Sequence, residues 1–283
     1  MRCILCDRSK KGDVQFFVCE DCKKFSETID IIWADVNEKF DTMDTIDPDI
    51  DPIFRLLSDS VFITSHNPQV AIFYKMSTVF VECAFKSITS ITEEELNRKL
   101  RTIRSLTDAL KVFEELGLIR VELDKYQRVI ILNDKIKKVA LSIQGGDRLD
   151  EQLIKRISQS FAGYVLLYLL YRMSKIREID EIYELPYKQK FRTLWVILMF
   201  LWTKAFEGNE SFQEKDLSKF LSQRRIPTAS ILPTLLNVDP RRLTGILRDV
   251  RMQGSDRIYY FSEYMLREME RLREVERERV ETR

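Results

Sequence analysis

The sequence predicts a mainly α-helical fold with small β-hairpins, and three observations support this. Glycine and proline are scarce, at 8 and 7 of 283 residues, and apolar residues recur at helical spacing through most of the chain. Two segments place a short β-rich hairpin directly after helices. Four of the five cysteines lie in the first 22 residues. With the turn and linker signals between them, these features divide the chain into six parts, at residues 1–25, 26–67, 68–145, 146–190, 191–261 and 262–283.

The composition excludes several classes of enzyme. The 46 Lys and Arg balance 45 Asp and Glu, so any attraction to nucleic acid has to come from local asymmetry of charge. The chain contains no GxGxxG and no GxxxxGKS/T motif, which excludes dinucleotide-binding and P-loop enzymes. The single histidine, His66, lies in a polar turn at an expected helix start and leaves little scope for acid–base catalysis. We find no nucleophile with a base partner and therefore expect a protein that is not an enzyme.

The N-terminal cysteines have the spacing of metal ligands. Two Cys-x2-Cys pairs are separated by twelve residues, and in between a turn signal at residues 10–13 precedes a β-rich run at residues 14–18. We expect a hairpin to return the second pair to the first, so that the segment resembles a zinc ribbon. The predicted ligands of one structural Zn²⁺ are Cys3, Cys6, Cys19 and Cys22. Two disulfides, or a redox or iron–sulfur site, stay open as alternatives, since spacing does not fix the metal.

An acidic segment follows, with ten acids and two bases between residues 26 and 60. Apolar residues at helical spacing from Ile29 to Phe40 predict a helix, which ends before the Asp- and Pro-rich stretch at residues 47–52. We interpret that stretch as a connector, although its carboxylates could also hold Mg²⁺. The acidic charge repels phosphate, so we expect this segment and the cysteine segment to contact a protein partner.

Residues 68–132 combine helices with a hairpin. We expect helices at residues 68–85, from a capping-box pattern at residues 90–96, and at residues 102–116, where Gly117 ends the last one. Strands at residues 118–123 and 128–132 then flank a polar turn. The string Leu110-x2-Phe-Glu-Glu-Leu-Gly-Leu-Ile119 followed by a hairpin resembles the winged-helix family of DNA-binding domains.

That resemblance implies that the third helix enters the major groove and the wing touches the DNA backbone. It would place Arg101, Arg104 and Ser105 near bases, and Lys125 and Arg128 near phosphates. The same helix face also carries Asp108 and Glu115, which oppose DNA contact. A protein-docking role for this segment therefore stays open beside DNA binding.

Residues 146–190 are expected to form a helical linker and core. The longest apolar runs, at residues 164–171 and 193–202, are too short to cross a membrane and are bounded by charged residues. We therefore expect buried helices and no membrane contact. Cys83 lies in another apolar stretch and is expected to be a small buried hydrophobe.

The last third repeats the plan less clearly. We expect helices at residues 191–206 and 215–222 with a capping box from Ser211 to Glu214, a helix at residues 241–251 capped by Asp239, and a wing strand at residues 257–261. Residues 215–257 hold nine bases against four acids, the most basic region of the chain. The predicted DNA contacts here are Arg224, Arg225, Arg241, Arg242, Thr244, Arg248, Arg251 and Arg257. The alternative is a solvated arginine-rich helix, as thermophilic proteins often carry.

The chain ends in a charged helix at residues 262–283. Its ragged apolar stripe, made of Tyr264, Met265, Met269, Leu272 and Val275, could pair across a homodimer. A single solvated helix held by ion pairs one turn apart explains the pattern nearly as well.

Together these features predict a transcription regulator that binds double-stranded DNA through winged helices, in a sequence-dependent or structural manner. Its structural zinc ribbon would contact a protein partner or nucleic acid. The Glu-, Lys- and Arg-rich composition is compatible with a thermophile, and the parts are similar to ribbon and winged-helix proteins of archaeal transcription and replication machineries. The N-terminus has no signal-peptide pattern, so we expect a cytoplasmic protein. Two alternatives remain: an adaptor subunit that docks on a polymerase, replication or ribosomal complex, and a replication initiator of the plasmid or virus type.

Overall fold

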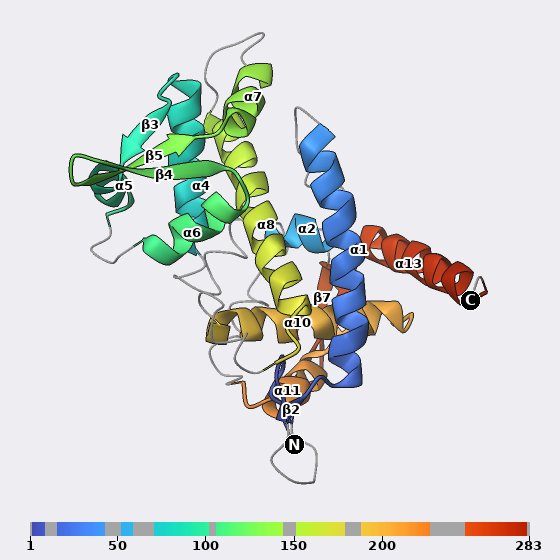
Figure 1. The fold of residues 1–283 in the computed structure, drawn as a ribbon. Helices are drawn as coiled ribbons and strands as arrows, with labels where there is room; N and C mark the ends of the chain where they lie inside the picture. Colours follow the sequence, from blue (N-terminus) through green and yellow to red (C-terminus); the bar gives the residue numbers. More distant parts are fainter. Residues whose placement is uncertain are drawn as a thin grey trace. The chain divides into compact units, whose positions relative to one another are not determined.

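The computed structural model describes residues 2–8, 16–42, 52–58, 71–101, 106–143, 151–178, 188–226 and 247–281. Within these ranges the chain is mostly helical, and its strands form three small sheets (Figure 1). This confirms the expected mainly α-helical class with small β-elements. The chain divides into two compact units, one made of residues 1–34, 49–56 and 168–283, the other of residues 35–48 and 57–167.

Residues 71–143 belong to the unit made of residues 35–48 and 57–167. They form a helix, a strand, two helices, a hairpin and a closing helix, an arrangement that we call the first repeat. Its sheet has the antiparallel strand order β3-β5-β4, with the helices packed beside it (Figure 1). The last helix returns to pack against the first. In chain order the elements are α4 (Ala71–Phe85), β3 (Ser90–Thr92), α5 (Glu93–Leu100), α6 (Thr107–Glu115), β4 (Ile119–Asp124), β5 (Gln127–Leu132) and α7 (Asp134–Ile143).

Local sequence signals explain where these elements begin and end. Thr92 caps α5, and Glu95 completes a capping box by accepting from the Thr92 backbone N–H. Gly117 (φ 64°) ends α6 in a Schellman motif, in which the Leu118 N–H donates to the Phe113 carbonyl. Lys125 and Tyr126 both have positive φ, as a two-residue turn between twisted strands requires. The expected hairpin and the Gly117 helix end are thus confirmed.

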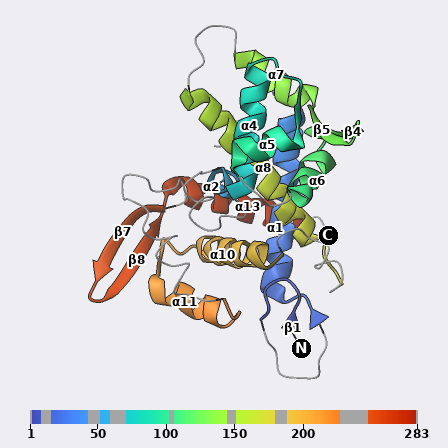
Figure 2. The same cartoon turned by 90° about the vertical axis from the view of Figure 1, so that its left-hand side faces the viewer.

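The first of the units contains a second repeat, whose described elements follow the same order; the part that corresponds to α6 lies outside the described residues. Its antiparallel sheet has the order β6-β8-β7, and its last helix again packs against its first. Figure 2 shows the hairpin of β7 and β8 in this repeat. Gly208 (φ 83°) ends the first helix, as the sequence predicts. The described elements are α10 (Lys188–Phe206), β6 (Ser211–Gln213), α11 (Glu214–Ser222), β7 (Leu247–Gln253), β8 (Asp256–Phe261) and α13 (Glu263–Glu281).

The described parts of the two repeats can be aligned along their lengths, apart from a β-bulge between Leu247 and Asp249. Corresponding residues are 121 positions apart from α4 to α5 and 129 apart in the hairpins, so the second repeat has eight more residues between its second helix and its hairpin. The Thr89 carbonyl accepts from the Leu132 N–H, and the Glu210 carbonyl accepts from the Phe261 N–H in the same way. The described parts of the chain therefore contain the arrangement of helix, strand, helix, hairpin and closing helix twice.

Three expected element boundaries are wrong. The described end of the helix expected at residues 241–251, from Leu247 onward, is strand β7, because it pairs with β8 across the tight turn at Gly254. The helix expected at residues 102–116 is seen from Thr107 only, and Arg101 is the left-handed C-cap of α5. Ser211 is not a helix cap: it lies in β6, and the N-cap of α11 is Gln213, which makes no side-chain capping bond.

Three more helices complete the described chain: α1 (Glu20–Thr42), α2 (Pro52–Leu57) and α8 (Glu151–Ser174). In one unit the Trp33 ring stacks on Tyr171, with ring centroids 5.2 Å apart. In the other unit the Phe40 ring stacks on Tyr164 at 3.8 Å. Aromatic pairs thus join α1 to α8 in both units; Phe40 and Tyr164 are buried, whereas Trp33 and Tyr171 are half-buried.

The apolar runs that we expected to be core helices are buried. Val165, Leu167, Val196 and Ile197, for example, have no exposed surface. Cys83 is also buried, and burial raises the pKa of its thiol. No helix in the described part of the chain combines the length and apolar content that crossing a bilayer requires. On α13 the apolar residues Met265, Met269 and Leu272 are buried within this chain, and the side chain of Val275 lies outside the described residues.

Candidate metal centre

The four N-terminal cysteines come from a tight turn and a helix start. Cys3 ends β1 (Arg2–Cys3), and the turn to Cys6 is closed by the Asp7 N–H, which donates to the Cys3 carbonyl. Cys19 directly precedes α1, and Cys22 lies in its first turn. The expected hairpin is wrong: β1 pairs with β2 (Phe16–Phe17) in parallel, and the second cysteine pair opens a helix.

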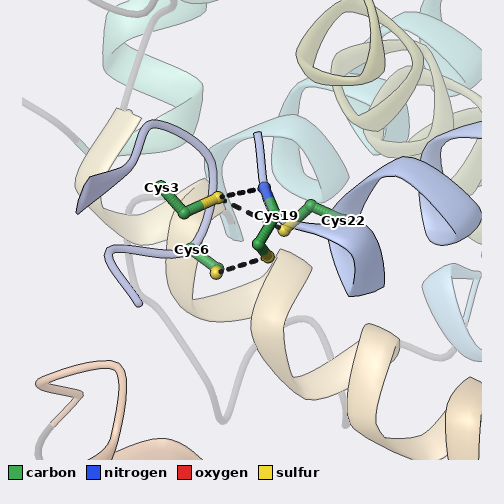
Figure 3. Close-up of side chains that lie close together, drawn as sticks. All are labelled: Cys3, Cys6, Cys19 and Cys22. Carbon is green, nitrogen blue, oxygen red and sulfur yellow. Dashed lines mark hydrogen bonds between the residues drawn. The ribbon is translucent and has the colours of Figure 1, made fainter. Parts of the chain in front are cut away.

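The sulfur geometry fits one tetrahedral metal ion. The Sγ atoms of Cys3 and Cys22 are 3.8 Å apart, those of Cys6 and Cys19 are 3.6 Å apart, and all four lie within 4.8 Å of one another (Figure 3). A tetrahedron with zinc–sulfur bonds of 2.3 Å has edges of about 3.8 Å. These separations also far exceed the ~2.05 Å of a disulfide bond, and all four cysteines are free and buried.

The thiols strongly influence one another's protonation. Hydrogen bonding to the Cys19 side chain, together with the Cys22 side chain and the Cys19 backbone N–H, lowers the pKa of Cys3 well below its usual range. Hydrogen bonding to Cys19, followed by Cys3 and Cys6, raises the pKa of Cys22. Four buried thiols that share protons in this way form a site in which a cation can replace protons and hold thiolates.

Helix α10 of the second repeat lies against this cluster. The indole Nε1–H of Trp195 donates to the Cys22 sulfur at 3.5 Å, and the Met199 sulfur lies 3.7 Å from the same atom. Arg192 donates to the carbonyl of Ile4 in the turn between the first two cysteines, at 3.2 Å. The chain thus supplies polar and sulfur contacts around the four ligands, as metal centres in proteins commonly have.

An ion-pair network fastens the cysteine segment to the end of α11. Asp21, between Cys19 and Cys22, accepts from Arg8 at 2.6 Å and from Arg224 at 2.8 Å. The Arg224 side chain is only 1% exposed, and its guanidinium lies 3.4 Å from the Phe220 ring centroid. Arg224 is therefore unavailable to a phosphate, which corrects its expected role as a DNA contact.

Two of the expected phosphate contacts occupy the same position in the two repeats. Arg128 on β5 pairs with Glu93 at 3.2 Å and also donates to Thr107. Arg257 on β8 lies 3.9 Å from Glu214. Glu93 and Glu214 are the first residues of α5 and α11, so each arginine ties a hairpin to the start of a helix.

The other expected contacts of the second repeat lie partly on β7. Arg251 pairs with Asp249 at 2.7 Å, which raises the pKa of Arg251 and lowers that of Asp249. Arg248 sits at a β-bulge and is 45% exposed, 4.0 Å from Glu263. Arg225, just after α11, is exposed in the left-handed conformation. Of the predicted contacts in this repeat, the exposed ones in the described chain thus lie on a strand and a turn, not on a helix.

In the first repeat the described helix face is acidic. The exposed residues of α6 and its C-terminal end are Thr107, Asp108, Lys111, Glu114 and Glu115. Arg101 is exposed at the end of α5, and Lys125 at the tip of the hairpin. The remaining predicted contacts lie outside the described residues; these are Arg104, Ser105, Arg241, Arg242 and Thr244. His66 also lies outside the described residues.

Comparison with models of known protein families, with curated proteins and with solved structures finds no match to this chain.

Proposed function

We propose that the protein is a non-catalytic, DNA-binding regulator built from a structural zinc centre and two winged-helix domains. The observation that carries the proposal is the repeated order of elements: helix, strand, helix, hairpin and a closing helix, each with a three-stranded sheet. A wing strand pair behind a helix is the arrangement by which winged helices reach DNA.

The four-cysteine cluster supports the zinc part of this proposal. A closed site of four buried sulfurs leaves no position for substrate, which is the pattern of a structural centre rather than a catalytic one. Zinc and iron both accept four thiolates, and a chain with no histidine in the cluster suits either. Zinc is our choice because closed tetrahedral sites of four cysteines are the usual structural zinc sites of proteins.

Elemental analysis of the purified chain tests the zinc assignment. We expect about one zinc per chain in the wild type and loss of it in Cys3→Ser, because three thiolates bind zinc far more weakly than four. Cys83→Ser is the matched control, since Cys83 is buried and is not one of the four clustered cysteines. Full retention of zinc in Cys3→Ser would reject the four-cysteine centre.

We assign DNA binding to the second repeat on charge. Its region from Lys215 to Arg257 has five more basic than acidic residues, or four more without the buried Arg224, and phosphate neutralisation by such residues dominates the affinity of DNA-binding proteins. The first repeat presents an acidic α6 face instead. In this proposal the second repeat binds DNA and the first repeat binds a protein partner.

A binding series on a DNA duplex with paired variants tests this division. Arg241→Ala/Arg248→Ala should lower affinity about tenfold or more, because each lost phosphate contact removes counterion release. Arg101→Ala/Arg104→Ala removes the same charge from the first repeat and should change affinity less than threefold. Equal effects of the two pairs would contradict the division of roles.

The second candidate function is an adaptor that docks on a larger complex through both repeats. The acidic α6 face and the tethering of Arg128 and Arg257 to glutamates favour it. This function predicts that the protein binds no duplex at low salt, or that any DNA affinity is unchanged by either arginine pair. The replication-initiator alternative shares the DNA-binding prediction and differs only in the target.

A further inference from the structure

We infer that Trp195 is a positioning residue of the metal centre, so that metal binding and the packing of α10 depend on each other. The inference rests on the proposed metal centre and adds a residue and a helix to it. Trp195 lies 173 positions from Cys22 in sequence and belongs to the second repeat.

The geometry around Trp195 carries this inference. Its ring is fully buried, and its Nε1–H has the Cys22 sulfur 3.5 Å away. The Phe25 ring lies against it edge-on, with centroids 4.8 Å apart, and restricts its orientation. The indole is therefore held with its only hydrogen-bond donor directed at a predicted metal ligand.

A hydrogen-bond donor in this position stabilises the metal-loaded form of the site. In the metal-loaded site Cys22 is a thiolate, and a buried thiolate is stabilised by an N–H donor because no water reaches it. The hydrogen bond also fixes where the sulfur points. Loss of an outer partner of this kind typically lowers metal affinity about 10–100-fold.

Metal binding and the packing of α10 stabilise each other to the same extent, because the two free energies are linked. If the indole of α10 favours the loaded site, the loaded site favours the observed packing of α10. The Arg192 bond to the Ile4 carbonyl and the Arg224 bond to Asp21 act in the same sense, since both join the cysteine segment to the second repeat. The packing of the cysteine segment against the second repeat should therefore be more stable when the metal is bound.

The chain offers a matched control for the test. Trp202 lies two turns further along α10, is also buried and also contacts Phe25, with centroids 5.9 Å apart. Within the described residues its Nε1 has no hydrogen-bond partner. Trp195→Phe and Trp202→Phe therefore remove the same atoms from the same helix, but only the first removes a donor to a cysteine sulfur.

The experiment measures Co²⁺ and Zn²⁺ binding by the full-length wild type and both variants. We expect Trp195→Phe to bind Zn²⁺ about 10–100-fold more weakly in competition with a chromophoric chelator and to shift the sulfur-to-cobalt charge-transfer band. Trp202→Phe should bind within about twofold of the wild type, with an unshifted band. An unchanged band and affinity in Trp195→Phe, or equal changes in both variants, would overturn the inference.

A second measurement needs no variant. In the wild type, Zn²⁺ should slow hydrogen exchange of the α10 amides about tenfold or more and leave those of α4 unchanged. If zinc binds but the α10 amides are not protected, the inference about Trp195 is wrong and the metal centre still stands. If the wild type binds neither Zn²⁺ nor Co²⁺, the proposed metal centre is wrong as well.

Discussion

At the scale of single residues, Arg224 shows how a charge can belong to the core. Its guanidinium is enclosed by Phe220, the Phe220 carbonyl and the Asp21 carboxylate. The sequence places Arg224 beside Arg225 in a basic stretch and gives no sign of this burial. The burial depends on Asp21, 203 positions away, so it follows from tertiary packing that no local pattern encodes.

Arg224→Ala should lower the free energy of unfolding by about 2–3 kcal/mol, because it leaves the partly buried Asp21 carboxylate with fewer partners and opens a cavity beside Phe220. Chemical denaturation of the metal-loaded protein measures this. The control is Arg225→Asn, which removes an exposed charge and accepts the left-handed conformation (φ 56°) of that position. Similar losses in both variants would show that Arg224 is not a structural residue.

The cysteines and Trp195 differ in how far sequence could reveal them. The Cys-x2-Cys spacing identified all four members of the cluster, because two ligands on one short turn leave a recognisable pattern. Trp195 lies in a continuous apolar run, in which a buried tryptophan is expected without any polar role. Only the fold brings its indole N–H to the Cys22 sulfur.

At the scale of elements, the two repeats differ in how their second helices begin. Thr92 caps α5 with its side chain, and Glu95 completes the box. Gln213 at the same position of α11 makes no side-chain capping bond. The repeats thus offer a comparison within one chain of a capped and an uncapped helix start.

Thr92→Ala should cost about 1 kcal/mol of stability, and Gln213→Ala close to none, since only the first substitution removes a cap. Unfolding at neutral pH measures both. The hydrogen bonds from Thr92, first of all from its backbone N–H, hold the pKa of Glu95 below its usual range, so the contribution of the Glu95 carboxylate is present above the unfolded pKa and is lost as pH falls through the lower folded pKa. A cost of Thr92→Ala no larger than that of Gln213→Ala would contradict the cap.

Strand β7 is the element that the sequence misplaced. Leu247 and Val250 continue the helical spacing begun by Leu243 and Ile246, and this predicts one helix through Arg251. In the structure Val250 pairs instead with Tyr259, and the bulge at Arg248 adjusts the register. Pairing with β8 decides the conformation of a segment that local periodicity left ambiguous. The first hairpin was predictable because Gly117 marks the helix end clearly.

At the scale of the whole molecule, the repeat is the main feature that sequence only hinted at. The side chains at corresponding positions mostly differ, but Glu93 and Glu214 pair with Arg128 and Arg257 in the same way. The partner helices α7 and α13 return to α4 and α10 alike. A shared plan with different surface charge supports the proposed division of roles between the repeats.

The salt dependence of DNA binding by the intact wild-type chain tests the central claim most directly. Binding to a duplex should be clear at low salt, and log K should fall linearly with log salt concentration with a slope of about −2 to −4, as two to four neutralised phosphates require. No binding at low salt, or an affinity that does not change with salt, would contradict DNA binding and favour the adaptor function.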